Sequence, residues 1–162
     1  MPRLHVLCGL PGSGKTTYAL GLLRTTRAVR LANDDWMVAL FGTNPSESEF
    51  RAAFARIEAL QWSLALELLR CDIDVIWDYG VWSRAARADL HARCRAAGAE
   101  FVLYDISCGF ETAVARVLAR NTDGAPYTAT LRIDRDAMEE FRRLYEPPSD
   151  DEGFDVVRVA SG

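Results

Sequence analysis

The chain has 162 residues, of which 49% are hydrophobic and 26% charged, and its formal net charge is −4. This length is typical of one globular domain with a single core. No apolar run approaches the ~20 residues that a membrane span needs, and the N-terminus leaves no room for a secretion signal before the first predicted strand. We therefore expect one domain over residues 1–162 that is located in the cytoplasm, does not contact a membrane and has no general attraction for polyanions.

Five apolar segments rich in β-forming residues alternate with segments of helical periodicity. The predicted strands cover residues 4–8, 29–32, 74–78, 101–106 and 154–159. The clearest helical pattern covers residues 49–70, where apolar residues recur at the 3.6-residue spacing of an amphipathic helix. This alternation predicts an α/β fold in which helices cover both faces of a parallel sheet.

The first predicted strand runs into GLPGSGKTT, and a helical segment follows. The spacing of its glycines, lysine and threonine satisfies GxxxxGK[ST], the pattern of a phosphate-binding loop. In such a loop the backbone N–H groups and the helix N-terminus wrap a phosphate, and the lysine approaches the β- and γ-phosphates. No guanine-reading NKxD motif with suitable spacing follows, which favours ATP. The predicted nucleotide-binding residues are Gly9, Leu10, Pro11, Gly12, Ser13, Gly14, Lys15, Thr16 and Thr17.

Acidic residues follow the second and third predicted strands. NDDW occupies positions 33–36, and Asp78 ends the third strand. Open parallel sheets bind ligands at the carboxyl ends of their strands, so Asp34 is the candidate general base for an acceptor hydroxyl. Asp35 and Trp36 are candidate substrate contacts, although either aspartate could instead cap the helix that follows. Asp78, together with the hydroxyl of Thr16, is a candidate ligand of Mg²⁺.

Two further segments carry candidate site residues. Tyr79 and Trp82 follow Asp78 in a loop and either stack on a flat acceptor or close the core; Arg87 is a further candidate substrate contact. Residues 110–121 predict a helix that places Arg116 and Arg120 one turn apart on one face. These arginines either clamp ATP and stabilise the phosphoryl group in transfer or form a solvated basic face.

The Gly- and Pro-containing segment 121–132 has the composition of a mobile flap.

The four cysteines are Cys8, Cys71, Cys94 and Cys108, and they have no metal-binding or redox spacing. We expect them to be reduced core thiols.

GLPGSGKTTYA, NDDW, VIWD and ARN together resemble the P-loop kinases related to polynucleotide kinase, chloramphenicol phosphotransferase and zeta toxin. The chain also resembles bacterial AAA-type ATP-binding proteins. The resemblance implies a five-stranded parallel sheet of order 2-3-1-4-5. It further implies that Asp34 is the general base, that Lys15 and Thr16 act at the phosphates and that Arg120 is the first lid arginine.

The chain departs from this pattern at two positions. Met37 stands where polynucleotide kinases tend to have an arginine that grips the substrate phosphate, and Gly124 stands where a second lid arginine is expected. Both changes remove positive charge on the acceptor side, although Arg116 could compensate for the second.

The predicted function is therefore ATP-dependent transfer of phosphate to a hydroxyl group of a small molecule, either an antibiotic or a metabolite, with Mg²⁺ as the metal. One alternative is a polynucleotide 5′-hydroxyl kinase with a basic acceptor groove, whose candidate residues are Arg51, Arg56, Arg84 and Arg87. Another is a nucleotide-binding module or ATPase without an acceptor.

Overall fold

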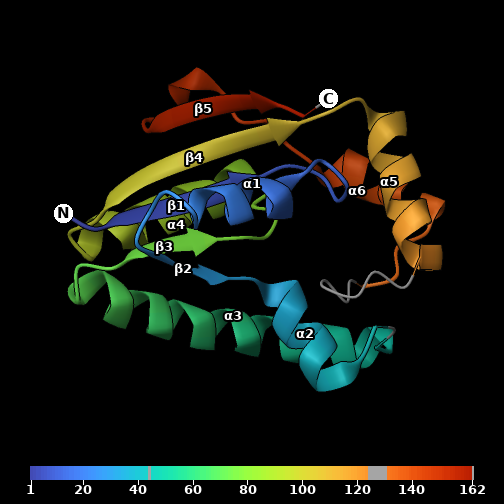
Figure 1. Ribbon diagram of the computed structural model, residues 1–162, viewed down its shortest axis with the longest axis horizontal. Coiled ribbons are helices and arrows are strands. Elements are labelled where there is room, and N and C mark those ends of the chain that lie inside the picture. Colours follow the sequence, from blue (N-terminus) through green and yellow to red (C-terminus); the bar gives the residue numbers. More distant parts are fainter. Residues whose placement is uncertain (44, 124–130, 162) are drawn as a thin grey trace.

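A five-stranded parallel sheet forms the centre of the computed structural model, which describes residues 1–43, 45–123 and 131–161 (Figure 1). The strands are β1 (Arg3–Cys8), β2 (Ala28–Leu31), β3 (Asp74–Trp77), β4 (Glu100–Ser107) and β5 (Asp155–Ala160). Their order in the sheet is β2-β3-β1-β4-β5, which confirms the predicted order. Because every strand points the same way, the loops that follow them meet at one edge.

The helices lie in the connections between successive strands. They are α1 (Lys15–Leu22), α2 (Asn33–Phe41), α3 (Glu47–Arg70), α4 (Arg84–Ala96), α5 (Phe110–Asp123) and α6 (Arg135–Leu144), with a short 3-10 helix, η1 (Asp150–Glu152). The helix predicted over 49–70 begins two residues earlier because Ser46 and Glu49 form a capping box. In Figure 1, α5 stands beyond the carboxyl ends of the strands.

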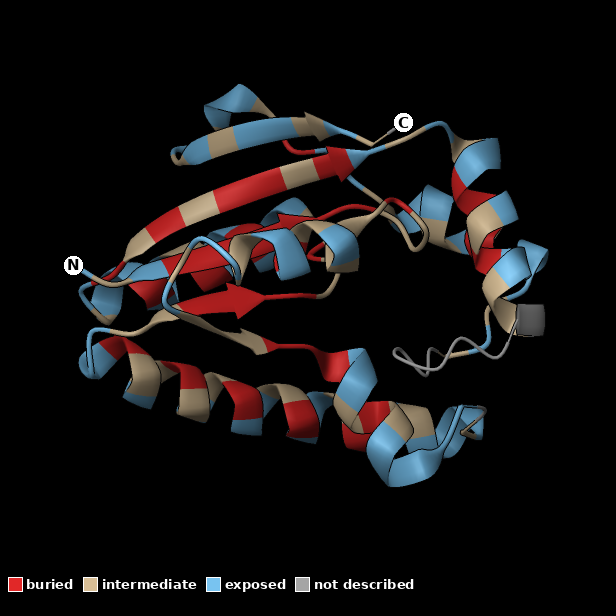
Figure 2. Cartoon of the chain, viewed as in Figure 1, coloured by how far each residue is buried: buried red, intermediate tan, exposed pale blue. Residues whose placement is uncertain are grey.

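Alternating residues of β1 build two apolar cores on opposite faces of the sheet. Leu4 and Val6 belong to a cluster with residues of α3 and α4, whereas Leu7 packs with Ala19 of α1. Successive side chains of a strand point to opposite faces, so one apolar strand can serve both layers. Figure 2 shows that β1 and β3, near the middle of the sheet, are largely buried.

Two expectations about local structure are wrong. The helix after β2 begins at Asn33 with Ala32 at its N-cap, so Asp34 and Asp35 lie in its first turn and do not cap it. Their charges still interact favourably with the positive end of the helix dipole. Cys71 is exposed beyond the end of α3, unlike the expected core thiols. Among the residues described, no helix has both the length and the apolarity of a membrane span.

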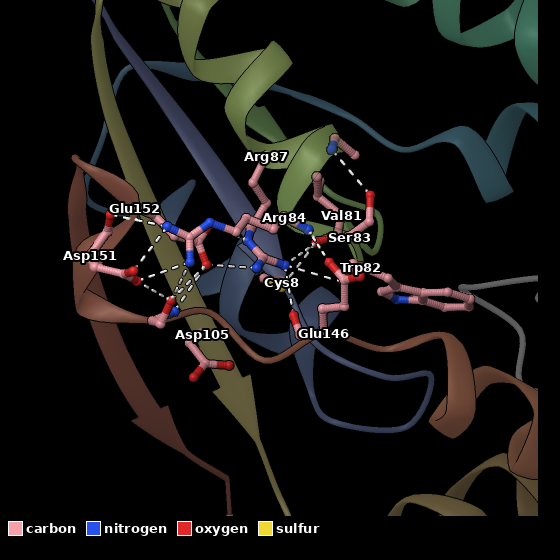
Figure 3. Close-up of polar contacts among 12 residues, drawn as sticks. Cys8, Val81, Trp82, Ser83, Arg84, Arg87, Asp105, Glu146, Asp151 and Glu152 are labelled. Atoms are coloured by element: carbon pink, nitrogen blue, oxygen red, sulfur yellow. Dashed lines mark hydrogen bonds and ion pairs between the residues drawn. The ribbon is translucent and has the colours of Figure 1, made fainter.

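Arg87 of α4 is the centre of a buried polar cluster (Figure 3). Its guanidinium donates two hydrogen bonds of 2.7 Å to the carboxylate of Glu152, and the side chains of both residues are almost fully buried. It also donates to the carbonyl oxygens of Val81, Trp82 and Glu146. Arg87 thus ties the loop after β3 to the C-terminal segment. The prediction that Arg87 contacts substrate is wrong, because protein groups already surround its donors.

Replacing Arg87 with Met should lower the free energy of unfolding by about 3–5 kcal/mol, because Glu152 would remain buried without a counter-charge. Urea denaturation measures this change. Arg84→Met is the matched control, since Arg84 lies on the same helix and pairs with Asp151 at the surface. We expect the control to stay close to wild type, and equal losses in the two variants would contradict the role given to Arg87.

Candidate active site

The loop between β1 and α1 is closely packed and depends on glycine. Gly9, Gly12 and Gly14 have φ values of 148°, 80° and 100°. A Cβ on Gly12 would lie 2.4 Å from the carbonyl oxygen of Ala113, and a Cβ on Gly9 would lie 2.3 Å from that of Ile106. The loop leads directly into α1, whose first N–H groups have no partner within the helix. This arrangement suits a bound phosphate.

Lys15 lies across this loop. Its Nζ donates hydrogen bonds of 2.9 Å to the carbonyl oxygens of Gly9 and Leu10. Burial lowers the pKa of Lys15, while the negative charges of Asp78 and Asp34 raise it. The lysine is thus held at the loop by neutral carbonyls and attracted to two carboxylates of neighbouring segments.

An open cavity of about 1320 Å³ lies beside this loop, at the carboxyl edge of the sheet. It gathers predicted site residues from four segments of the chain. Those that line it are Pro11, Gly12, Gly14, Lys15, Thr16, Thr17, Asp34, Asp35, Asp78, Tyr79, Trp82, Arg116 and Arg120. Gly9, Leu10 and Ser13 belong to the loop without lining the cavity.

Trp36 does not belong to this group. It packs against a small core cluster that contains Met37, Ala53 and Ile57, where α2 meets α3. The predicted substrate contact at Trp36 is therefore wrong, because its position on α2 turns the ring toward α3 instead of the cavity.

Asp34 is exposed to the cavity, yet protein surrounds it on several sides. This desolvation raises the pKa of Asp34, as do the negative charges of Asp78 and Asp35. The positive charges of Lys15 and Arg120 act in the opposite direction. A carboxylate with a raised pKa is a stronger base than a fully solvated one, which suits it to accept a proton.

Arg30 is a site residue that sequence reasoning missed. Its Nε donates to Asp78 and its Nη1 to Asp35, both at 2.6 Å. Arg30 therefore connects the first turn of α2 to the end of β3 and neutralises two of the acids beside Asp34. In the sheet Arg30 pairs with Ile76, two residues before Asp78. The sequence contained no direct signal of this contact, because it depends on the register between two strands.

The arginines of α5 reach the loop and the cavity from the opposite side. Arg116 donates to the carbonyl oxygen of Gly12 at 3.3 Å and to the hydroxyl of Ser161 at 3.1 Å. The Nε of Arg120 is buried and has no hydrogen-bond partner among the described residues. Burial lowers the pKa of Arg120, while Asp34 raises it. Arg116 and Arg120 both line the cavity, so they lie on one side of α5 as their spacing predicts.

The predicted flap lies mostly outside the described residues, which exclude 124–130 and so Gly124. Among the described residues, the side-chain amide of Asn121 donates a hydrogen bond of 2.8 Å to the carbonyl oxygen of Ile133, across the two sides of this segment. Leu131, Arg132 and Ile133 line the cavity.

Tyr79 and Trp82 both line the cavity and pack against other rings. The indole N–H of Trp82 donates to the carbonyl oxygen of Gly9 at 3.2 Å, and its ring lies 4.9 Å from that of Phe141. The ring of Tyr79 lies 5.0 Å from that of Trp77. Tyr79 and Trp82 therefore close the core and also present surface to a ligand. The two roles that the sequence suggested for them, stacking on a ligand and closing the core, are compatible.

The predicted basic acceptor groove is not formed by the residues proposed for it. Arg51 pairs with Glu47, Arg84 pairs with Asp151, and Arg87 is buried. None of these arginines, nor Arg56, lines the cavity.

The residues that could hold Mg²⁺ are few. Thr16 and Asp78 line the same cavity, and one carboxylate oxygen of Asp78 accepts a hydrogen bond from Arg30. Within residues 1–43, 45–123 and 131–161, no three His, Cys, Asp or Glu side chains gather as a metal site. Magnesium beside nucleotides usually keeps several waters and binds one or two protein oxygens plus phosphates. Thr16 and Asp78 fit such a site.

Comparison with known proteins adds independent findings. The family model described as an AAA domain matches residues 4–148. No curated protein matches the sequence. Chaetomium thermophilum Kti12 in complex with ADP-AlF3 has a TM-score of 0.72 and 21% identity, over 97% of this chain and 88% of that chain.

Two further solved structures show the same fold. A chain of the Pnkp1/Rnl/Hen1 RNA repair complex has a TM-score of 0.71 and 26% identity over 88% of this chain, which spans only 43% of that larger chain. A gluconokinase from Sinorhizobium meliloti 1021 has a TM-score of 0.58 and 16% identity, over 98% of this chain and 82% of that chain.

Replacing Arg30 with Ala should lower the free energy of unfolding by about 3 kcal/mol, because the buried carboxylate of Asp78 would lose its counter-charge. Urea denaturation of Arg30→Ala, Asp78→Asn and the double variant measures this pair. We expect the double variant to be less destabilised than the sum of the two single variants. Strict additivity would show that the two side chains do not interact.

Proposed function

The chain belongs to the AAA domain family and has the fold of the P-loop kinases, and from this premise we propose that it is an ATP-dependent phosphotransferase. In this proposal the γ-phosphate of ATP is transferred to a hydroxyl group of a small molecule. The observation that carries the proposal is the position of Asp34. This carboxylate lines one cavity with the glycine loop, Lys15 and Arg120, as general-base transfer requires.

The glycine loop is the proposed site for the phosphates of ATP. Backbone N–H groups of Gly12 to Thr17 would bind phosphate oxygens, and Lys15 would exchange the carbonyls of Gly9 and Leu10 for them. Thr16 and Asp78 would hold Mg²⁺, which when bound supplies positive charge to the β- and γ-phosphates. The crowding around Gly9 and Gly12 supports this assignment, because a side chain there would fill the loop.

Asp34 and the arginines of α5 have distinct proposed roles. Asp34 accepts the proton of the acceptor hydroxyl as the oxygen bonds to the γ-phosphorus. Arg120 is directed by its attraction to Asp34 toward the place where negative charge develops. Arg116, which contacts Gly12 of the loop, would bind the phosphates from the same helix.

A small acceptor is favoured over a polynucleotide. The four arginines considered for a nucleic-acid groove lie outside the cavity, and three of them are paired with acids. The similarity to a chain of an RNA repair complex keeps a 5′-hydroxyl polynucleotide as the alternative acceptor. The raised pKa of Asp34 and its position beside the cavity suit transfer of phosphate to a hydroxyl group. An ATPase without an acceptor would need neither feature.

Asp34→Asn should reduce phosphoryl transfer by ~10² or more, because the amide keeps the shape of the side chain and cannot accept the proton. Affinity for ATP should change little. The wild-type rate should also fall as the pH drops through a pKa above about 3.9, the usual value for aspartate, since the base must be ionised.

Asp35→Asn is the matched control, because it removes the neighbouring charge on the same helical turn. Steady-state kinetics and ATP titration of both variants separate the two positions. An Asp34→Asn protein with wild-type transfer would eliminate Asp34 as the base.

Arg120→Ala should lower kcat more than it weakens ATP binding, because its charge is needed most when the phosphoryl group separates from ADP. Arg116→Ala should show the same pattern to a smaller degree, since Arg116 also holds Ser161. Kinetics with varied ATP measure both effects. If Arg120→Ala changes only the affinity for ATP, Arg120 binds ATP before the reaction and does not stabilise the transition state, which would contradict its proposed role.

A further inference from the structure

The carbonyl oxygen of Gly9 accepts hydrogen bonds from two side chains. Nζ of Lys15 donates to this oxygen at 2.9 Å, and the indole N–H of Trp82 donates to it at 3.2 Å. Gly9 is buried, and a carbonyl oxygen has two lone pairs, so this one oxygen can serve both donors. Trp82 and the proposed phosphate-binding lysine therefore meet at a single atom.

The loop after β3 brings the indole to this oxygen through a close approach at Gly80. A Cβ on Gly80 would lie 1.9 Å from Nε1 of Trp82 and 2.6 Å from its Cδ1. Gly80 does not have the positive φ of the glycines in the glycine loop, so glycine is needed here for space and not for its backbone conformation. Any side chain at position 80 would push the indole away from Gly9.

Contacts on the other side of Trp82 hold it in this position. Its carbonyl oxygen accepts from Arg87 at 3.2 Å and from the backbone N–H of Glu146 at 2.9 Å. Its ring lies 4.9 Å from that of Phe141 on α6. Figure 3 shows this ring pointing away from the Arg87 cluster, which binds the Trp82 backbone. The buried pair of Arg87 and Glu152 therefore supports the indole that contacts the glycine loop.

The charge of Lys15 is placed by the same oxygen. Among the described residues, Nζ donates to the carbonyl oxygens of Gly9 and Leu10. Burial lowers the pKa of Lys15, because an ammonium group taken out of water loses solvation. A displacement of about 1 Å at a reacting centre can cost about 10²-fold in rate. The position of the Gly9 oxygen therefore matters to any phosphate chemistry at Lys15.

The indole bond also matters when a phosphate draws Lys15 away from the carbonyls. A buried carbonyl oxygen that loses its donor pays the full cost of desolvation. The indole N–H is held by the loop after β3 and does not have to follow the nucleotide. It would keep the Gly9 oxygen paired after Lys15 has turned to the phosphates.

We infer that Trp82 is a positioning residue for Lys15. Its indole N–H holds the Gly9 carbonyl in place, which directs the ammonium group of Lys15 before a nucleotide binds and leaves the carbonyl paired afterwards. This inference rests on the proposed function, in which Lys15 binds the phosphates of ATP. It gives Trp82 a role that needs no contact between its ring and the acceptor.

The indole N–H resonance of Trp82 in ¹H–¹⁵N spectra tests the contact with Lys15 without any nucleotide. Lys15→Met should move this resonance downfield, because the Gly9 oxygen then accepts from the indole alone. Trp82→Phe identifies the resonance by its loss. The indole of Trp62 is the internal control, since Trp62 packs on Trp77 and does not line the cavity. An unchanged Trp82 resonance in Lys15→Met would overturn the inference.

Mg·ADP binding, measured by calorimetry, tests the consequence for the nucleotide. Trp82→Phe removes the N–H and keeps a ring, so affinity should fall about fivefold, a usual net value for one hydrogen bond. Combined with Lys15→Met, the same change should weaken binding by less than about twofold, because its effect passes through Lys15. Equal losses in the two backgrounds would overturn the inference, since Trp82 would then act on the loop independently of the lysine.

Gly80→Ala is the second variant should Trp82→Phe fail to fold, because its Cβ displaces the indole and leaves both side chains present. It should weaken Mg·ADP binding by a similar factor, and unchanged binding would count against the inference. Trp62→Phe is the matched control and should bind Mg·ADP as the wild type does.

The two measurements separate this inference from the proposed function. A protein that shows the indole shift in Lys15→Met and binds no Mg·ADP would support the contact of Trp82 with Lys15 and contradict the proposed function. Wild-type binding of Mg·ADP without any indole shift in Lys15→Met would overturn the positioning role and leave the phosphotransferase.

Discussion

The close approach between the glycine loop and α5 is the constraint on which the candidate site depends. Gly12 lies so near Ala113 that no side chain fits between them. Arg116 and Arg120 follow Ala113 at intervals of three and seven residues, which keeps all three on one face of α5. The contact that forces glycine into the loop therefore also brings one arginine onto the loop and the other toward Asp34.

Paired charges organise the rest of the site. Arg30 binds Asp35 and Asp78, which come from different segments, while Asp34 interacts with Lys15 and Arg120. The positive charges of Lys15 and Arg120 lower the pKa of Asp34 and so oppose burial and the two neighbouring acids, which raise it. The structural ion pairs of Arg30 thus lie in the same group of charges as Asp34, the proposed catalytic carboxylate.

The sequence was sufficient to predict what depends on local pattern. The strand order followed from the family resemblance, and the glycine spacing, the amphipathic helix over 49–70 and the positions of Arg116 and Arg120 followed from residue types at fixed intervals. It could not predict partners that lie far apart in sequence. Arg87 was predicted to contact substrate, whereas it binds Glu152, which lies 65 residues away, and the contacts of Arg30 depend on strand register.

The central claim is that the γ-phosphate of ATP passes to a hydroxyl group and not to water. The most direct measurement is ³¹P NMR of Mg·ATP incubated with the protein, with and without a mixture of aryl alcohols, sugars and 5′-hydroxyl oligonucleotides. We predict a phosphomonoester signal, and ADP formation that depends on the mixture. ADP and inorganic phosphate appearing at the same rate without it, and no ester in its presence, would contradict the account.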